Sequence, residues 1–249
     1  MAANYTCTNF PHNNKTYLIL QTKASNIKLV SLYREKGQCE TVKNSGYYGM
    51  NASFFNPGSS SVRPYAIHNI ALQDGKSTGV GKTYPDWENA TDGTVNLAGD
   101  SVICWSGSKL SCLNGVRYST AAGVPQLRNT WAQGGFGLHL CDKDWQKKFA
   151  AELSAEEYPF TASAARTGIL INKSTNYVYL FVCTSSILIS ALRSAMMAYA
   201  GLTEGGSAGN WAAIMTDGGL SAQLYTEEKS AAVVMARKVP QIIALKNID

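Results

Sequence analysis

The alternation of hydrophobic and polar positions predicts many short strands and few helices. Residues 145–157 have a helical composition rich in lysine and glutamate. Runs that are apolar, or that alternate with period two, favour strands. Such runs lie at residues 16–20, 27–33, 67–76, 102–105, 131–140, 169–171, 223–225, 232–235 and 241–245. The pattern therefore favours a fold that combines sheet and helix.

The clearest element is a strand, a helix and a second strand that follow one another. Val178–Cys183 is apolar and β-branched, which favours a strand buried on both faces. Apolar residues then recur at helical spacing over residues 188–199, and Gly201 stands where a helix would end. Trp211–Met215 is a second apolar run. We expect these two strands to be parallel and joined by a right-handed crossover.

A glycine turn follows the second of these strands. Asp217 stands at the carboxyl end of the strand, where open α/β sheets place their ligands. Gly218 and Gly219 let the backbone turn sharply and approach a ligand closely. Ser221 and the amides of the turn are suited to an anion. The same residues also form an ordinary tight turn, because Asp-Gly pairs are common in turns, so both interpretations stay open.

The composition fits one sizeable globular unit. The chain has 249 residues, of which 45% are hydrophobic, enough for a substantial core. We predict a single α+β domain over residues 1–249, with a mixed β-sheet and a few packed helices. The strand–helix–strand unit lies near its C-terminus. No internal repeat or low-complexity linker divides the sequence.

The charge pattern argues against large charged partners. The net charge is +5, but lysine and arginine are scattered, so we expect neither a nucleic-acid polymer nor a membrane as partner. No apolar run is long enough to span a membrane. Residues 1–7 lack the apolar segment of a secretory signal. We expect a cytoplasmic protein, or a secreted one if a leader has been removed. The sequence leaves the oligomeric state open.

Several familiar kinds of site are missing from the sequence. There is no C-x-x-C pair, P-loop, dinucleotide fingerprint or G-x-S-x-G elbow. His12, His68 and His139 lie in settings that favour structural roles, which argues against a Ser-His-Asp hydrolase. We expect neither a metal nor a cofactor. Cys104 and Cys112 flank a hairpin tip and could form a disulfide, although the missing signal favours free thiols.

Four short motifs remain, and each is weak when taken alone. They are Asn51–Phe55, Gly134–Gly135, Arg166–Gly168 and Asp217–Ser221. In this order they resemble the phosphodiester glycosidase family. That family's pattern is N-G-x-F-F, a Gly-Gly passage, R-T-x-x-G, D-G-G-x-S, and an arginine before a last apolar strand. The four motifs correspond to the first four parts of this pattern, and Arg237 corresponds to the arginine.

The resemblance covers most of the chain, from about residue 27 to residue 249. The chain departs from the pattern at Ala52 and Ser53, where the family usually has glycines, and at Ala222, where threonine is common. The first change narrows the space beside Asn51. It bears on the substrate more than on the reaction.

The resemblance implies hydrolysis of the bond between a sugar's anomeric carbon and a phosphodiester. Asp217 would be the nucleophile or base, Arg166 would hold the phosphate, and Asn51 would orient a sugar hydroxyl or a phosphate oxygen. A second carboxylate is wanted, for which Asp74 and Glu204 are the candidates. The expected partner is a small sugar phosphate. The substrate-binding residues would be Thr167, Gly218, Gly219, Ser221, Gly134 and Gly135.

Two other functions stay open. A module of the same fold could bind a phosphorylated sugar or nucleotide without turnover, and loss of Asp217 or Arg166 would favour it; neither residue is lost. A structural protein, for example of a virion, would be favoured if Asn51, Arg166 and Asp217 lay far apart. A shared site requires these residues within about 15 Å of one another, the span of a small-molecule pocket.

Overall fold

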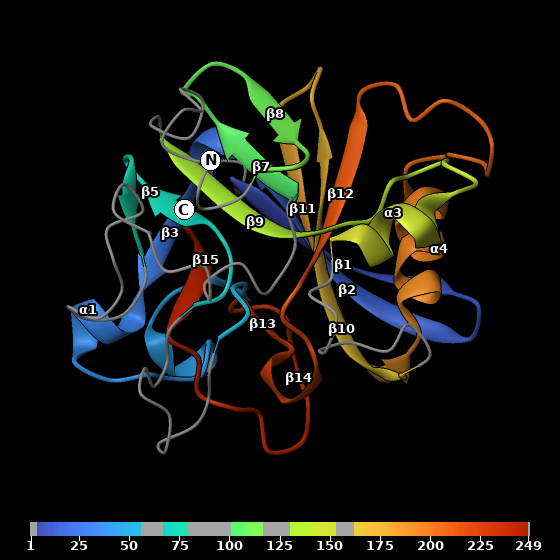
Figure 1. Ribbon diagram of the computed structural model, residues 1–249. Helices are drawn as coiled ribbons and strands as arrows, with labels where there is room; N and C mark the ends of the chain where they lie inside the picture. Colours follow the sequence, from blue (N-terminus) through green and yellow to red (C-terminus); the bar gives the residue numbers. More distant parts are fainter. Residues whose placement is uncertain (1–3, 56–66, 79–100, 117–129, 153–161, 249) are drawn as a thin grey trace.

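Two antiparallel sheets dominate the computed structural model, which describes residues 4–55, 67–78, 101–116, 130–152 and 162–248 (Figure 1). In the larger sheet the strand order is β1-β2-β11-β10-β12-β9-β5-β6, and the β7–β8 hairpin joins through β9. Its strands are β1 (Tyr5–His12), β2 (Lys15–Lys23), β5 (Ala71–Gln73), β6 (Lys76–Ser77), β7 (Ser101–Trp105), β8 (Leu110–Leu113), β9 (Trp131–Gly137), β10 (Ala164–Asn172), β11 (Tyr177–Ile187) and β12 (Trp211–Thr216).

The second sheet is smaller and has the strand order β14-β13-β4-β15-β3. Three α-helices complete the described part of the chain, and α3 and α4 pack on one face of the larger sheet (Figure 1). The strands are β3 (Ile27–Ser31), β4 (Gly49–Asn51), β13 (Gln223–Tyr225), β14 (Ser230–Ala232) and β15 (Gln241–Leu245). The helices are α1 (Leu32–Lys36), α3 (Trp145–Ala151) and α4 (Ile189–Tyr199).

The α+β fold class and the mixed sheet were wrong predictions. Within the described residues strands account for 46% and helices for 16%, so the fold is mainly β. The predicted unit exists as β11, α4 and β12, but β10 lies between its two strands and pairs antiparallel with both. The outer strands therefore run in the same direction, as expected, although every strand pairing in the described part is antiparallel. A local pattern cannot reveal that a third strand separates them.

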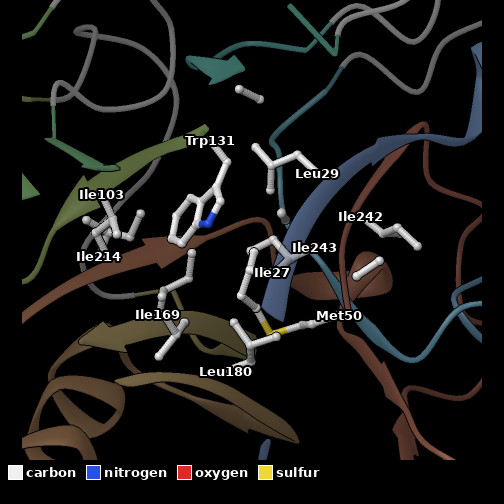
Figure 2. Close-up of a cluster of buried hydrophobic side chains, with 14 of the residues drawn as sticks. Ile27, Leu29, Met50, Ile103, Trp131, Ile169, Leu180, Ile214, Ile242 and Ile243 are labelled. Carbon is white, nitrogen blue, oxygen red and sulfur yellow. The ribbon is translucent and has the colours of Figure 1, made fainter. Parts of the chain in front are cut away.

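The larger sheet buries both of its faces. Along β10, Ile169 and Ile171 face the second sheet, whereas Leu170 faces the layer of α3 and α4, because side chains alternate along a strand. Figure 2 shows the core between the sheets, where Ile169 of β10 and Ile243 of β15 lie near Trp131. The indole of Trp131 donates a hydrogen bond from Nε1 to the carbonyl of Ala24 at 2.9 Å. This core fixes the position of one sheet against the other.

Other predictions met mixed outcomes. The hairpin tip predicted between Cys104 and Cys112 is confirmed as the turn between β7 and β8, and all six cysteines are free thiols. The strand predicted at 232–235 was wrong, because β14 ends at Ala232 and the chain then turns outward. The first strand, β1, was missed because its residues are largely polar and exposed. Residues 82–99, whose polar pattern indicates an irregular segment, lie outside the described residues. So do residues 116–127, whose pattern is ambiguous, except for Val116, and so does the predicted helix at 145–157 from residue 153 onward.

The Gly-Gly passage of β9 runs unusually close to neighbouring backbone. A Cβ atom on Gly135 would lie 2.3 Å from the carbonyl oxygen of Met215 in β12, an impossible contact, whereas one on Gly134 would lie 3.0 Å from the carbonyl of Ile70. The first contact demands that a strand move. The second demands only a small adjustment.

We therefore expect Gly135→Ala to lower the free energy of unfolding by about 3 kcal/mol and Gly134→Ala by about 1 kcal/mol. Urea denaturation of the two variants beside the wild type measures both changes. The substitutions are chemically identical and adjacent, so each serves as the control for the other. Equal losses would show that the spacing between β9 and β12 is not a rigid constraint.

Candidate functional site

The backbone of Asp217 is held where the two sheets meet. Asp217 follows β12, and its N–H donates to the carbonyl of Ala52 at 2.9 Å. Its carbonyl accepts hydrogen bonds from Asn51 Nδ2 and from Thr167 Oγ1, each at 2.6 Å. Asn51 ends β4 of the smaller sheet and Thr167 belongs to β10 of the larger one. Both sheets therefore fix the backbone of this one residue.

Asn51 is a buried brace in this structure. Its Oδ1 accepts a hydrogen bond from the backbone N–H of Gln223 at 2.9 Å, while its Nδ2 holds the Asp217 carbonyl. The side chain is 1% exposed. The amide thus ties β4 to both ends of the glycine turn. A direct contact between Asn51 and a ligand stays a prediction.

Two glycines after Asp217 serve different purposes. A Cβ atom on Gly218 would lie 2.4 Å from the carbonyl oxygen of Ala165 and 3.3 Å from the Cα of Arg166, so only glycine fits against β10. Gly219 has a φ of +58° and open space around it, so its role is the left-handed turn itself. The Asp-Gly-Gly sequence therefore presses the turn against the end of β10.

The carboxyl group of Asp217 sits in an unfavourable place for a charge. Burial raises its pKa to about 7, well above the ordinary value of 3.8. The hydroxyl of Ser221, the charge of Arg237 and the N–H of Gly218 oppose this shift only in part. The hydroxyl of Ser221 is fully buried, and no described atom meets the distance and angle criteria for a hydrogen bond with its Oγ. It nevertheless lies close enough to the Asp217 carboxylate to lower the pKa of that group.

Arg237 is the residue that sequence reasoning left out of the site. It lies after β14 and is half-buried, and its N–H donates to the carbonyl of Leu220 at 2.8 Å. Its guanidinium carbon lies 5.8 Å from the ring centroid of Phe55. Its charge lowers the pKa of Asp217. The arginine that precedes the last apolar strand in the family pattern was the only sequence signal for it.

Arg166 lies at the same corner of the molecule, on β10. Its guanidinium is buried and donates from Nη2 to the carbonyl of Ala162 at 2.6 Å. The backbone of Arg166 packs against Gly218, and Asn51 contacts Asp217 directly. The backbones of Arg166 and Asp217 and the side chain of Asn51 therefore meet at one corner, whereas convergence of the three side chains on one cleft stays a prediction.

The Gly134–Gly135 passage reaches the site indirectly. A Cβ atom on either glycine would first meet neighbouring backbone, at Ile70 for Gly134 and at Met215 for Gly135. The side chain of Asn69 links it to the segment after β4: Nδ2 donates to the Gly134 carbonyl at 3.1 Å, and Oδ1 accepts from the N–H of Phe54 at 2.9 Å. Substrate binding by the two glycines stays a prediction.

The candidates for a second carboxylate lie elsewhere in the fold. Asp74 is exposed at the turn between β5 and β6, and Glu204 pairs with Arg193 at 2.6 Å beside α4. No carboxylate is among the described groups that shift the pKa of Asp217. The described ranges also contain no group of three or more His, Cys, Asp or Glu side chains placed to hold a metal ion. In the same ranges, no helix has the length and apolar character needed to cross a membrane.

The two-sheet fold resembles folds found among solved structures. The chain is similar to the zebrafish N-acetylglucosamine-1-phosphodiester α-N-acetylglucosaminidase catalytic domain auto-inhibited by its pro-peptide. The TM-score is 0.61 at 11% identity, over 98% of this chain and 83% of that one. It is also similar to a hypothetical protein from Synechocystis, with a TM-score of 0.50 at 12% identity, over 96% of this chain and 61% of that one. No family model and no curated protein matches the sequence, so these likenesses concern the fold alone.

The buried carboxyl of Asp217 predicts a pH-dependent stability. Because its pKa is higher in the folded chain than in the unfolded one, the folded state binds the proton more tightly, and stability falls as pH rises from about 4 through about 7. Asp217→Asn removes this loss. We expect the stability of the variant relative to wild type to rise between pH 4 and pH 8.5 by up to about 4 kcal/mol. Urea unfolding at both pH values measures it, with exposed Asp144→Asn as control. A pH-independent difference would contradict the burial of a charge.

The brace made by Asn51 predicts a second stability effect. Asn51→Ala leaves the N–H of Gln223 buried without its acceptor and removes one donor from the Asp217 carbonyl. We expect a loss of about 2–3 kcal/mol in the free energy of unfolding. Asn9→Ala, on the exposed surface of β1, is the matched control and should change little. If both variants unfold alike, the brace contributes nothing.

Proposed function

We propose that this protein is a hydrolase that cleaves the glycosidic bond between a sugar's anomeric carbon and a phosphodiester. The observation that carries the proposal is the buried carboxyl of Asp217, at the carboxyl end of β12 beside the cation of Arg237. The motif resemblance and the fold likeness to a phosphodiester glucosaminidase domain support the same reaction class.

Asp217 suits the role of nucleophile or base. Glycoside hydrolysis requires water to attack the anomeric carbon while an oxocarbenium-like state is stabilised. A carboxyl group with a pKa of about 7 is substantially ionised at neutral pH and still takes up a proton readily. Its backbone carbonyl is held by both sheets, so the side chain extends from a rigid backbone position.

The leaving group explains how one carboxylate could suffice. A phosphate monoester has a second pKa of about 6, so it departs more readily than a sugar alkoxide and needs no dedicated acid. Arginine holds phosphate oxygens in a two-pronged hydrogen bond. Arg166 and Arg237 are the candidates for this contact. A charge-assisted hydrogen bond is worth about 1.5–3 kcal/mol, which gives one to two decades of rate if it strengthens in the transition state.

A non-catalytic binding module is the second candidate. No second carboxylate is among the described groups that shift the pKa of Asp217, and ordinary glycosidases use two carboxylates. This observation favours the binding module. Such a module would use the same arginines and turn amides to hold a phosphorylated sugar or nucleotide. It would release no sugar.

Sugar release from a panel of methyl phosphodiesters of common sugar 1-phosphates, in both anomeric forms, separates the two functions. We expect the wild type to turn over one of them and Asp217→Asn to lose at least about 10³-fold in kcat/KM, with Asp144→Asn unchanged. Because the ionised carboxylate is the working form, kcat/KM should rise with pH through about 7.

Three outcomes would overturn parts of this proposal. Saturable binding of a phosphodiester without sugar release would establish the binding module. Turnover that survives in Asp217→Asn would remove Asp217 from the chemistry. A rate that falls as pH rises through 7 would make the protonated carboxyl, a general acid, the working form.

A further inference from the structure

Exposed apolar side chains gather beside the Asp217 turn. Among the described residues five large hydrophobic side chains are exposed: Leu188, Leu220, Val234, Met235 and Ile248. Leu220 belongs to the glycine turn, and Val234 and Met235 lie just before Arg237. Single exposed apolar residues are ordinary, but a group of them next to a candidate site marks a contact surface.

Backbone hydrogen bonds hold this group together. The N–H of Val233 donates to the carbonyl of Ala222 at 3.3 Å, and the N–H of Arg237 donates to the carbonyl of Leu220 at 2.8 Å. The segments 220–222 and 233–237 therefore run side by side. Residues 234–236 bulge outward between the two bonds, beyond the end of β14 in Figure 1.

The bulge exposes side chains that the sequence pattern would place in a strand. Val234 is 89% exposed and Met235 is 87% exposed. Met235 also has a φ of +60°, a left-handed backbone that is unfavourable for residues other than glycine, asparagine and aspartate. Met235 thus has an unfavourable backbone conformation, and its side chain is not buried in return. Backbone outliers of this kind gather at ligand-binding positions.

We propose that Leu220, Val234 and Met235 form an apolar rim that binds the alkyl chain of an amphipathic sugar phosphodiester. This inference rests on the proposed function and names the group beyond the phosphate. Arg237, two residues after Met235, supplies the positive charge for the phosphate. An alkyl chain esterified to that phosphate would lie directly against the rim.

The size of the rim favours a chain of this kind over a protein partner. A stable protein interface buries about 800 Å² on each side. Three side chains provide only a fraction of that area, but they match a short alkyl group. The adjoining cation suits an anionic head next to the apolar tail.

Two parallel arms test the rim. The first compares hydrolysis of the methyl and octyl phosphodiesters of N-acetylglucosamine 1-phosphate, and of the best sugar from the methyl panel. The second compares binding of octyl phosphate and methyl phosphate by calorimetry, below the micelle concentration, and needs no turnover. The proteins are the wild type, the double variant V234S/M235S, and Leu188→Ser, an exposed apolar residue outside the rim.

We expect the wild type and Leu188→Ser to favour the octyl compound about tenfold or more in each arm, and the double variant to favour it by less than about twofold. Equal hydrolysis of both esters would overturn the rim and leave the proposed function standing. Hydrolysis of neither ester would overturn the proposed function for this substrate, while the binding arm still decides the rim. A third outcome would also overturn the proposal. If the wild type shows no octyl preference, and the double variant loses self-association or vesicle binding that the wild type has, the rim binds another copy of the chain or a lipid surface instead.

Discussion

The backbone of Asp217 is the point at which the two sheets are tied together. Its N–H and carbonyl bind the segment after β4 on one side and β10 on the other. The packed core between the sheets sets the distance that these hydrogen bonds span (Figure 2). Because the backbone is fixed from both sides, the Cα–Cβ bond of Asp217 points in a set direction, and the residue is only 9% exposed. The raised pKa of Asp217 is therefore a consequence of the fold.

A carboxylate in this position is unfavourable for stability. Ser221, Arg237 and Gly218 offset its burial only in part, and hydrophobic packing alone would have favoured an apolar residue. Ionisable groups whose pKa is displaced by burial are common at functional sites, because the displacement matches them to proton transfer near neutral pH. The proposed role of Asp217 as nucleophile or base would make use of this unfavourable placement.

Local patterns in the sequence were sufficient to predict many strands and the corner where the motifs meet. The runs at 102–105 and 241–245 are strands because their apolar character is strong and continuous. The order of the sheets was beyond such reasoning: β10 inserts between β11 and β12 through long-range pairing, which no window of the sequence contains. The edge strand β1 has little apolar content, so it gave no periodic signal.

The candidate site was likewise predictable only in its local motif and not in its long-range contacts. The glycine turn and its aspartate were visible as a motif, whereas Arg237 approaches Asp217 only because the chain bulges after β14. The apolar character of Val234 and Met235 favours a buried strand. Because the chain bulges there, both side chains are exposed instead. Asn51 was correctly placed near Asp217, but its amide binds backbone groups that sequence alone could not identify.

Carbon-13 NMR of the aspartate side-chain carboxyls across the pH range tests the central claim most directly, with Asp217→Asn identifying the resonance. The account predicts that Asp217 titrates with a midpoint near 7, because the fold holds its carboxyl out of water. A midpoint near 4 would show that the carboxyl group is solvated. It would contradict both the burial of the charge and the chemical role proposed for it.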